Sequence, residues 1–103
     1  METITGTQAI EKMRLLKGVQ NATFGIIFFT HTHFKTEYTN NAKLRKYENC
    51  RLRAAKRAEG TSTNSDHYLF FTDLDTNEPR TCWKKLIRQA RFGNTWNKVQ
   101  WFL

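Results

Sequence analysis

The sequence predicts a mainly β protein, a small and strongly bent antiparallel barrel or open sandwich of about five strands after one N-terminal helix. Three observations support this fold class. Short apolar segments rich in Phe, Ile and Thr recur along the chain, turn-forming residues separate them, and only the first segment has helical periodicity. A chain of 103 residues suits a single domain over 1–103, which can bury a core without disulfides or metal ions.

The helix is predicted over residues 6–17. The apolar residues Ile10, Met13 and Leu16 recur at a helical spacing, with charged residues on the other faces. Thr5 or Thr7 can cap the first turn with its hydroxyl, and Gly18 follows the last turn, where glycine commonly ends a helix.

The first long strand is predicted between residues 21 and 35, where large apolar residues occupy both faces. A turn follows at Asn40 and Asn41, because Asn tolerates left-handed backbone.

Residues 43–58 fit two structures. At a period of two, one face of a strand carries Cys50, Leu52 and Ala54 and the opposite face carries Arg51 and Arg53. At a period of 3.6, the apolar residues line a helix that Gly60 ends. We favour the strand, because Arg51 interrupts the apolar stripe of the helix. A strand also predicts that changing Arg51 and Arg53 to Glu leaves folding nearly intact.

The remaining elements are short. Residues 60–66 are small and polar, and they are predicted to form a flexible surface loop. The elements after it are a strand over 67–73, a turn over 74–79, a hairpin partner over 80–83, a 3₁₀ turn over 84–87, a strand over 88–92 and a last apolar segment over 96–103.

The sequence also predicts a cytoplasmic protein with no membrane contact. Its longest apolar run, 24–29, is far shorter than the roughly 20 residues of a spanning helix. The polar N-terminus lacks the basic flank and apolar core of a signal peptide. Cys50 and Cys82 have no CxxC spacing, so we expect reduced, partly buried strand residues.

A series of short motifs carries a resemblance to a known group of proteins. The motifs are Phe24 to Phe29, Cys50-Arg51, Phe71 to Asp75, Arg80-Thr81 and Leu86-Ile87. Over residues 8 to 99 their order resembles small SH3-like β-barrel proteins carried by bacterial phages and mobile elements. The resemblance implies an SH3-like antiparallel barrel of about five strands in a protein of the host cell cytoplasm. Because those proteins have no assigned activity, no functional residue carries over.

Motifs of enzyme and metal sites are missing from the sequence, which contains no GxxxxGK[ST], GxGxxG, GxSxG or HExxH pattern. His31 and His33 share one side of a strand but lack further ligands nearby, so we interpret them as solvent-facing. Asp73 and Asp75 flank a predicted turn, where Asp side chains cap backbone N–H groups. We therefore expect a protein that is not an enzyme and that has no cofactor and no metal site.

Basic residues give the strongest functional signal. Of the 17 Lys and Arg, seven lie between Lys43 and Arg57 and six between Arg80 and Lys98. Two such segments with almost no acid are typical of a phosphate-binding surface, although a solvated strand face has the same composition. The predicted phosphate-binding residues are Arg45, Lys46, Arg51, Arg53, Lys56 and Arg57 in one group and Lys84, Lys85, Arg88 and Arg91 in the other, with Trp83 and Trp96 as stacking residues.

The sequence thus predicts a module that binds nucleic acid, DNA or RNA, through its phosphates. An alternative from another class is a phage-type inhibitor that binds a host protein or, as a homo-oligomer, sequesters a small nucleotide. Cations and aromatic residues would serve that role as well, because they grip phosphate and stack on a base.

Overall fold

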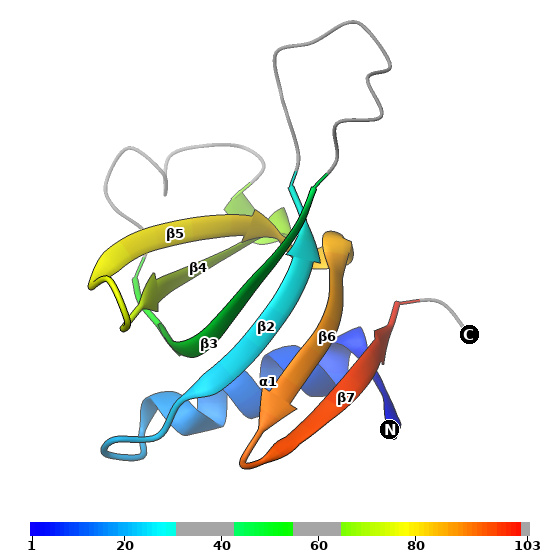
Figure 1. Ribbon diagram of the computed structural model, residues 1–103, viewed down its shortest axis with the longest axis horizontal. Helices are drawn as coiled ribbons and strands as arrows, with labels where there is room; N and C mark the ends of the chain where they lie inside the picture. Colours follow the sequence, from blue (N-terminus) through cyan, green and yellow to red (C-terminus); the bar gives the residue numbers. More distant parts are fainter. Residues whose placement is uncertain (31–42, 55–64, 102–103) are drawn as a thin grey trace, which may run out of the picture.

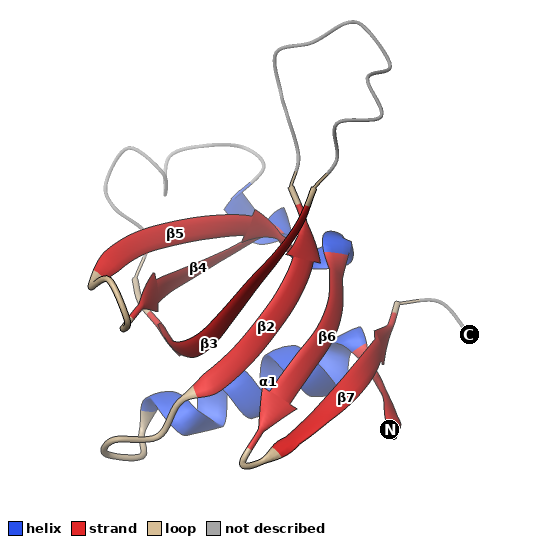
Figure 2. Ribbon diagram, in the orientation of Figure 1, coloured by secondary structure: helices blue, strands red, loops and turns tan. Residues whose placement is uncertain are grey.

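One curved sheet of seven strands and one α-helix make up the part of the chain that the computed structural model describes, which is residues 1–30, 43–54 and 65–101. Strands dominate this part, as Figure 2 shows, so the predicted mainly β class is confirmed. In chain order the elements are β1 (Thr3–Thr5), α1 (Gly6–Lys17), β2 (Phe24–Phe29), β3 (Leu44–Leu52), η1 (Ser65–His67), β4 (Tyr68–Asp73), β5 (Glu78–Trp83), η2 (Lys84–Leu86), β6 (Ile87–Phe92) and β7 (Thr95–Gln100).

The helix forms where the sequence predicts it. Thr5 accepts a hydrogen bond on its hydroxyl from the backbone N–H of Gln8 (3.1 Å), and the Gln8 side chain accepts one from the Thr5 N–H (3.0 Å). This capping box satisfies two donors that a helix start would otherwise leave open. Gly18 follows the last turn, and its N–H donates to the Leu15 carbonyl at 3.2 Å. The predicted cap and the predicted end are therefore both confirmed.

The sheet is open. Its strand order is β1-β7-β6-β2-β3-β4-β5, and every neighbouring pair is antiparallel except β1 and β7. The prediction of about five strands in a barrel is not confirmed, because β1 adds to β7 as an outer strand and leaves β1 and β5 as the two edges. No local pattern indicates β1, since three residues are too few for an alternating pattern.

The helix covers one face of the sheet, on the far side in the view of Figure 1. From α1, the buried residues Ala9, Ile10 and Met13 join a core that includes Phe24 and Ile26 of β2. These two residues alternate along β2, so they lie on the face of the strand that the helix covers. We call the helix-covered side the inner face and the opposite side the outer face.

Trp101 closes the core beside the helix. Gly6 lies so close to it that an added Cβ would be 2.1 Å from the indole ring, which explains glycine at this position. The indole N–H donates to the Ile87 carbonyl at 3.1 Å. Trp101 thereby joins the start of α1 to the start of β6.

The uncertain segment after residue 43 forms a strand, which confirms the preferred structure for the described residues up to Leu52. The strands predicted over 67–73, 80–83 and 88–92 and the 3₁₀ turn over 84–87 are also present within two residues. Some predictions concern residues 31–42 and 55–64, which lie outside the described residues. They are the predictions for His31, His33, the Asn40-Asn41 turn and most of the 60–66 loop.

Cys50 and Cys82 are buried strand residues, in β3 and β5. Burial, with a smaller effect of the Asp73 and Asp75 charges, raises the pKa of Cys50 to about 12. Burial also raises the pKa of Cys82. Both thiols therefore stay protonated at neutral pH.

The predicted turn role of Asp73 is confirmed. Its buried carboxylate accepts hydrogen bonds from the backbone N–H of Asp75 (3.1 Å) and from the hydroxyl of Thr76 (2.9 Å). The Asp75 carboxylate accepts one from the Asn49 side chain at 3.1 Å. The two carboxylates thus fix the β4–β5 turn against β3.

Candidate nucleic-acid interface

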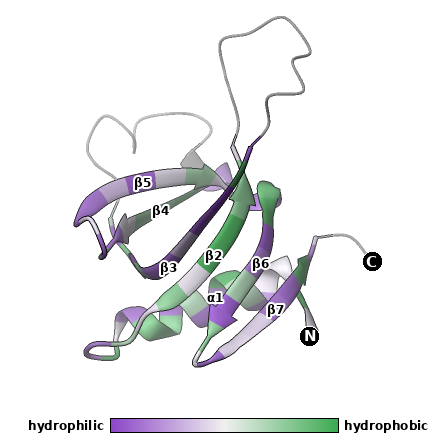
Figure 3. Cartoon of the chain, in the orientation of Figure 1, coloured by the Kyte–Doolittle hydropathy of each residue, from purple (hydrophilic) through white to green (hydrophobic). Residues whose placement is uncertain are grey.

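A row of polar side chains crosses the outer face of the sheet from β7 to β3. Lys98 of β7 lies opposite Gln89 of β6, Gln89 lies opposite Ile27 of β2, and Ile27 lies opposite Lys46 of β3. Directly opposed residues share a face, so both lysines lie on the outer face. In Figure 3, polar colouring on β3 and β6 flanks the more apolar β2.

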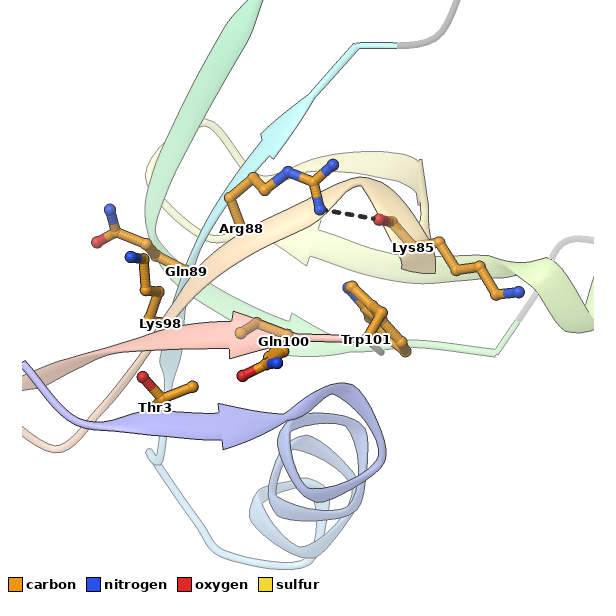
Figure 4. A pocket seen from close by; sticks show the side chains of 8 residues that line it. Thr3, Lys85, Arg88, Gln89, Lys98, Gln100 and Trp101 are labelled. Atoms are coloured by element: carbon orange, nitrogen blue, oxygen red, sulfur yellow. Dashed lines mark hydrogen bonds between the residues drawn. The ribbon is translucent and has the colours of Figure 1, made fainter. Parts of the chain in front are cut away.

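A groove of about 520 Å³ lies at the β7 end of this row. Three cations line it: Lys85 of η2, Arg88 of β6 and Lys98 of β7. Gln89, Gln100 and Thr3 add polar groups, and Figure 4 shows these side chains arranged around the ends of β1, β6 and β7, with Trp101 beside them. No carboxylate is among the described residues that line the groove. Three cations that line one groove favour the binding of an anion there.

Arg88 is held in place at this groove. One terminal nitrogen of its guanidinium donates to the Lys85 carbonyl at 3.3 Å, drawn as the dashed line in Figure 4. Its guanidinium carbon also lies over the Phe29 ring, 5.5 Å from the centroid. A single carbonyl contact leaves most of the five guanidinium donors of Arg88 for a ligand.

Trp96 is on the outer face but lies flat against the sheet. Its ring passes over Gly25, where an added Cβ would be 2.9 Å from the indole. The Lys46 ammonium lies over the same ring, 5.1 Å from the centroid, and forms an ion pair with Glu48 at 3.5 Å. Because Gly25 lies against the ring and a cation lies over it, the structure does not favour the predicted stacking of bases on Trp96.

Trp83 packs against other aromatic residues. Its ring centroid is 4.7 Å from that of Tyr68 and 6.1 Å from that of His67. It lines a second cavity, of about 420 Å³, together with Lys84 and Lys85. The structure therefore places Trp83 and Lys84 beside the groove cation Lys85, but apart from Trp96.

Arg51 has a structural role. Its guanidinium donates to three main-chain carbonyls, those of Lys17 (2.9 Å), Val19 (2.8 Å) and Ala22 (2.6 Å). These carbonyls belong to the end of α1 and to the connection into β2, where a helix leaves acceptors without partners. The structure does not favour the prediction that Arg51 binds phosphate, since three hydrogen bonds to protein carbonyls already use its guanidinium.

Arg53 is bound in a similar way. It donates to the carbonyls of Phe71 (3.0 Å) and Arg80 (3.1 Å), and its guanidinium lies over the Phe70 ring at 5.5 Å. Arg53 therefore joins the end of β3 to β4 and β5. The structure also argues against the expectation that Arg51 and Arg53 can both become Glu without loss of folding, because these carbonyls would then face carboxylates.

Arg91 of β6 lies on the outer face but is used mainly by the protein. Its guanidinium donates to the carbonyls of Glu48 (2.6 Å) and Gly93 and to the Thr23 hydroxyl (3.3 Å). Arg91 thus links β6 to β3 across β2 and contributes charge to the face with few free donors.

The other predicted residues fall in three places. Lys46 lies on the outer face, and Arg45 lies in a third cavity on the inner side of β3. Lys56 and Arg57 lie outside the described residues. The structure thus brings together Lys85 and Arg88, with Lys84 next to them, and it separates them from Arg45, Arg51 and Arg53.

Lys98 is the groove cation that the predicted set omits. A usable signal was present: Asn97 and Val99 are buried, so a period of two places Trp96, Lys98 and Gln100 together on the outer face. The contributions of Gln89 and Thr3 depend on strand pairing, which short-range patterns do not show.

Three acids of the described residues lie away from the groove. Asp73, Asp75 and Glu78 lie at the β4–β5 turn, at the opposite edge of the sheet from β1. Two others lie closer to it: the Glu2 carbonyl accepts a hydrogen bond from the Lys98 N–H at 2.8 Å, and Asp66 lines the second cavity together with Lys85. The positive field at the groove is therefore partly cancelled.

Comparisons with protein-family models, curated proteins and solved structures found no match for the chain. Among residues 1–30, 43–54 and 65–101, His, Cys, Asp and Glu form no group of three that could hold a metal ion. In the same ranges, no helix combines the length and apolar character needed to cross a bilayer.

Proposed function

We propose that this protein is a non-enzymatic module that binds nucleic acid through phosphate groups on the outer face of its sheet. The observation that supports the proposal is the groove of Lys85, Arg88 and Lys98, which no carboxylate lines among the described residues. Cations that neutralise phosphates release condensed counterions, and this release drives sequence-independent binding.

The state of the aromatic residues favours backbone contacts over base contacts. On the outer face, Lys46 covers Trp96 and Arg88 covers Phe29, so these rings already have cations over them. Binding that depends on phosphates alone has little sequence preference. We expect similar affinities for unrelated sequences of the same length and charge.

The experiment replaces two groove cations and compares them with a matched pair. The double variant Arg88→Gln with Lys98→Gln removes two charges from the groove. The control Arg14→Gln with Lys17→Gln removes two exposed charges from α1, on the other face. Fluorescence anisotropy with labelled 20-mers of single- and double-stranded DNA and RNA measures the affinity at several salt concentrations.

The groove variant is expected to bind about tenfold more weakly at low salt, and its salt slope should fall by about 0.7 to 0.9 for each lost contact. The control should change far less. Equal weakening in both variants would mean that only net charge matters, and unchanged binding in the groove variant would remove the proposal. Saturable binding of a mononucleotide that exceeds the affinity for every 20-mer would favour the nucleotide-sequestering alternative.

A further inference from the structure

A cavity of about 500 Å³ lies on the inner side of the sheet, where β2 and β3 approach the edge strand β5. We call it the seam cavity, because it lies between the edge strand β5 and the strands β2 and β3. Phe28 of β2 and Thr30, just after β2, line it on one side. Arg45 and Tyr47 of β3 and Arg80 and Thr81 of β5 complete the part of the lining that matters here. The groove of the proposed nucleic-acid interface lies on the outer face and shares none of these residues.

Strand register puts the two arginines of the cavity on the same side as the core. Arg45 lies opposite Phe28, and Arg80 lies opposite Phe71. The rings of Phe28 and Phe71 meet edge to face at 6.1 Å in the core. Two guanidinium groups therefore stand at the open end of the apolar interior, and no carboxylate is among the described residues that line the cavity.

Within the described part of the chain, Arg80 has one ion pair at the surface and one buried donor without an acceptor. Its Nε is buried and has no hydrogen-bond acceptor among the described residues. Its guanidinium lies over the Tyr47 ring at 5.5 Å, and its ion pair with Glu78, at 3.5 Å, is largely exposed to solvent. A buried donor without an acceptor is unfavourable, and an anion in the cavity would reduce this cost electrostatically.

The polar groups of the cavity fit an oxyanion. Thr30 accepts a hydrogen bond from the Lys43 N–H at 3.0 Å, which leaves its own hydroxyl proton to be donated. Guanidinium groups match the geometry of phosphate oxygens and bind them with two parallel hydrogen bonds. The Tyr47 ring already stacks with Phe28 at 5.8 Å and lies under Arg80, so charge and not base stacking would select the ligand.

We propose that the seam cavity binds a phosphate group, as free phosphate or as the phosphate of a small monoester. Arg45 and Arg80 hold the oxygens, and the Thr30 hydroxyl donates to one of them. This site is separate from the proposed nucleic-acid interface and does not depend on it.

The test is calorimetric titration with inorganic phosphate, with adenosine monophosphate and with acetate, all at the same ionic strength. The unchanged protein should bind both phosphates saturably and acetate at least tenfold more weakly. Preference for adenosine monophosphate over phosphate would identify a monoester as the ligand, and equal affinities would identify the phosphate group alone. Acetate binding as tight as phosphate binding, or no saturable binding, would overturn the proposal.

Variants then locate the site. Arg45→Gln and Arg80→Gln should each weaken phosphate binding at least tenfold, whereas the exposed helix variant Arg14→Gln should bind as the unchanged protein does. Arg45 is exposed, so Arg45→Gln tests the site even where loss of the Arg80 contact with Tyr47 disturbs folding. Unchanged phosphate affinity in Arg45→Gln would overturn the site. The groove variant Arg88→Gln with Lys98→Gln should keep phosphate binding, which separates this result from the nucleic-acid test.

Discussion

The basic residues of β3 and those of the β6–β7 region look alike in the sequence but are used differently. At the end of β3, Arg51 and Arg53 donate to main-chain carbonyls of other segments. In the β6–β7 region, Lys98 and Arg88 line a groove, and Arg88 has one carbonyl contact. The comparison shows that the density of charge along a chain does not locate a ligand site. Protein carbonyls compete with a ligand for the N–H donors of the basic side chains.

Arg91 shows that the local geometry, and not the strand to which an arginine belongs, decides whether it binds main-chain carbonyls. It belongs to β6, yet it donates to carbonyls on β3 and in the β6–β7 turn. It lies opposite Gly25, where the missing side chain gives its guanidinium room to cross β2. An arginine binds to the main chain where carbonyls that lack another donor lie within reach of its guanidinium.

Among the variants considered, replacement of Arg51 is expected to lower the stability of the fold most. We expect Arg51→Gln to lower the free energy of unfolding by about 2 to 4 kcal/mol, because hydrogen bonds to a charged group contribute about 1.5 to 3 kcal/mol each and are not additive. Urea denaturation measures the loss. Arg45→Gln, an exposed change on the same strand, is the control and should stay within about 0.5 kcal/mol. If both variants were equally stable, the distinction between structural and groove cations would be wrong.

A middle-sized effect is expected from Gly25→Ala. The new Cβ would be 2.9 Å from the Trp96 ring and 3.0 Å from the Cβ of Arg91, so both side chains must move. Overpacking of this kind costs about 1 to 3 kcal/mol. The same shift should weaken nucleic-acid binding, since Lys46 lies on Trp96. Gly18→Ala, whose Cβ would meet its nearest atom at 3.7 Å, should change neither quantity by a comparable amount.

The smallest effect concerns the buried thiols of the β3–β5 region. Burial raises the pKa of Cys50 from 9.0 to about 12 and also raises that of Cys82, so the unfolded chain loses these protons first as the pH rises. The contribution of the two thiols to the free energy of unfolding is therefore fully present well below pH 9, and it is lost progressively as the pH rises above 9. At pH 9 each thiol should already lower the free energy of unfolding slightly, by less than about 1 kcal/mol, relative to pH 7.

Urea denaturation at pH 7 and pH 9 measures this change. The control is Cys50→Ala with Cys82→Ala, which removes both thiols and should show a smaller loss between the two pH values. The same loss in both proteins would assign the effect to other groups.

Local patterns were enough for much of the fold. The helix cap, predicted at Thr5 or Thr7, the end of α1 at Gly18 and the hairpin of β4 with β5 depend on residues that are close in sequence, and the sequence predicts them. The parallel pairing of β1 with β7 joins distant segments, and no local pattern indicates it. The sheet is open because its edge strands β1 and β5 do not pair with each other, and so the predicted barrel is not observed.

The candidate site was less predictable for the same reason. The carbonyl partners of Arg51 lie near the end of α1, far along the chain, and only the folded structure brings them together. Arg88 and Lys85 could be identified from composition. The joint lining of one groove by Lys98 and Thr3 depends on the β1–β7 pairing.

That pairing has a consequence for the order of folding. Thr3 lies opposite Lys98, so β1 has no partner until the chain has been synthesised as far as β7. Contacts between such distant segments carry a high loop-closure entropy and form late. Because Thr3 lines the groove, a chain that has collapsed around its central strands still lacks one wall of the groove. The proposed nucleic-acid interface would therefore be complete only after β1 has paired with β7.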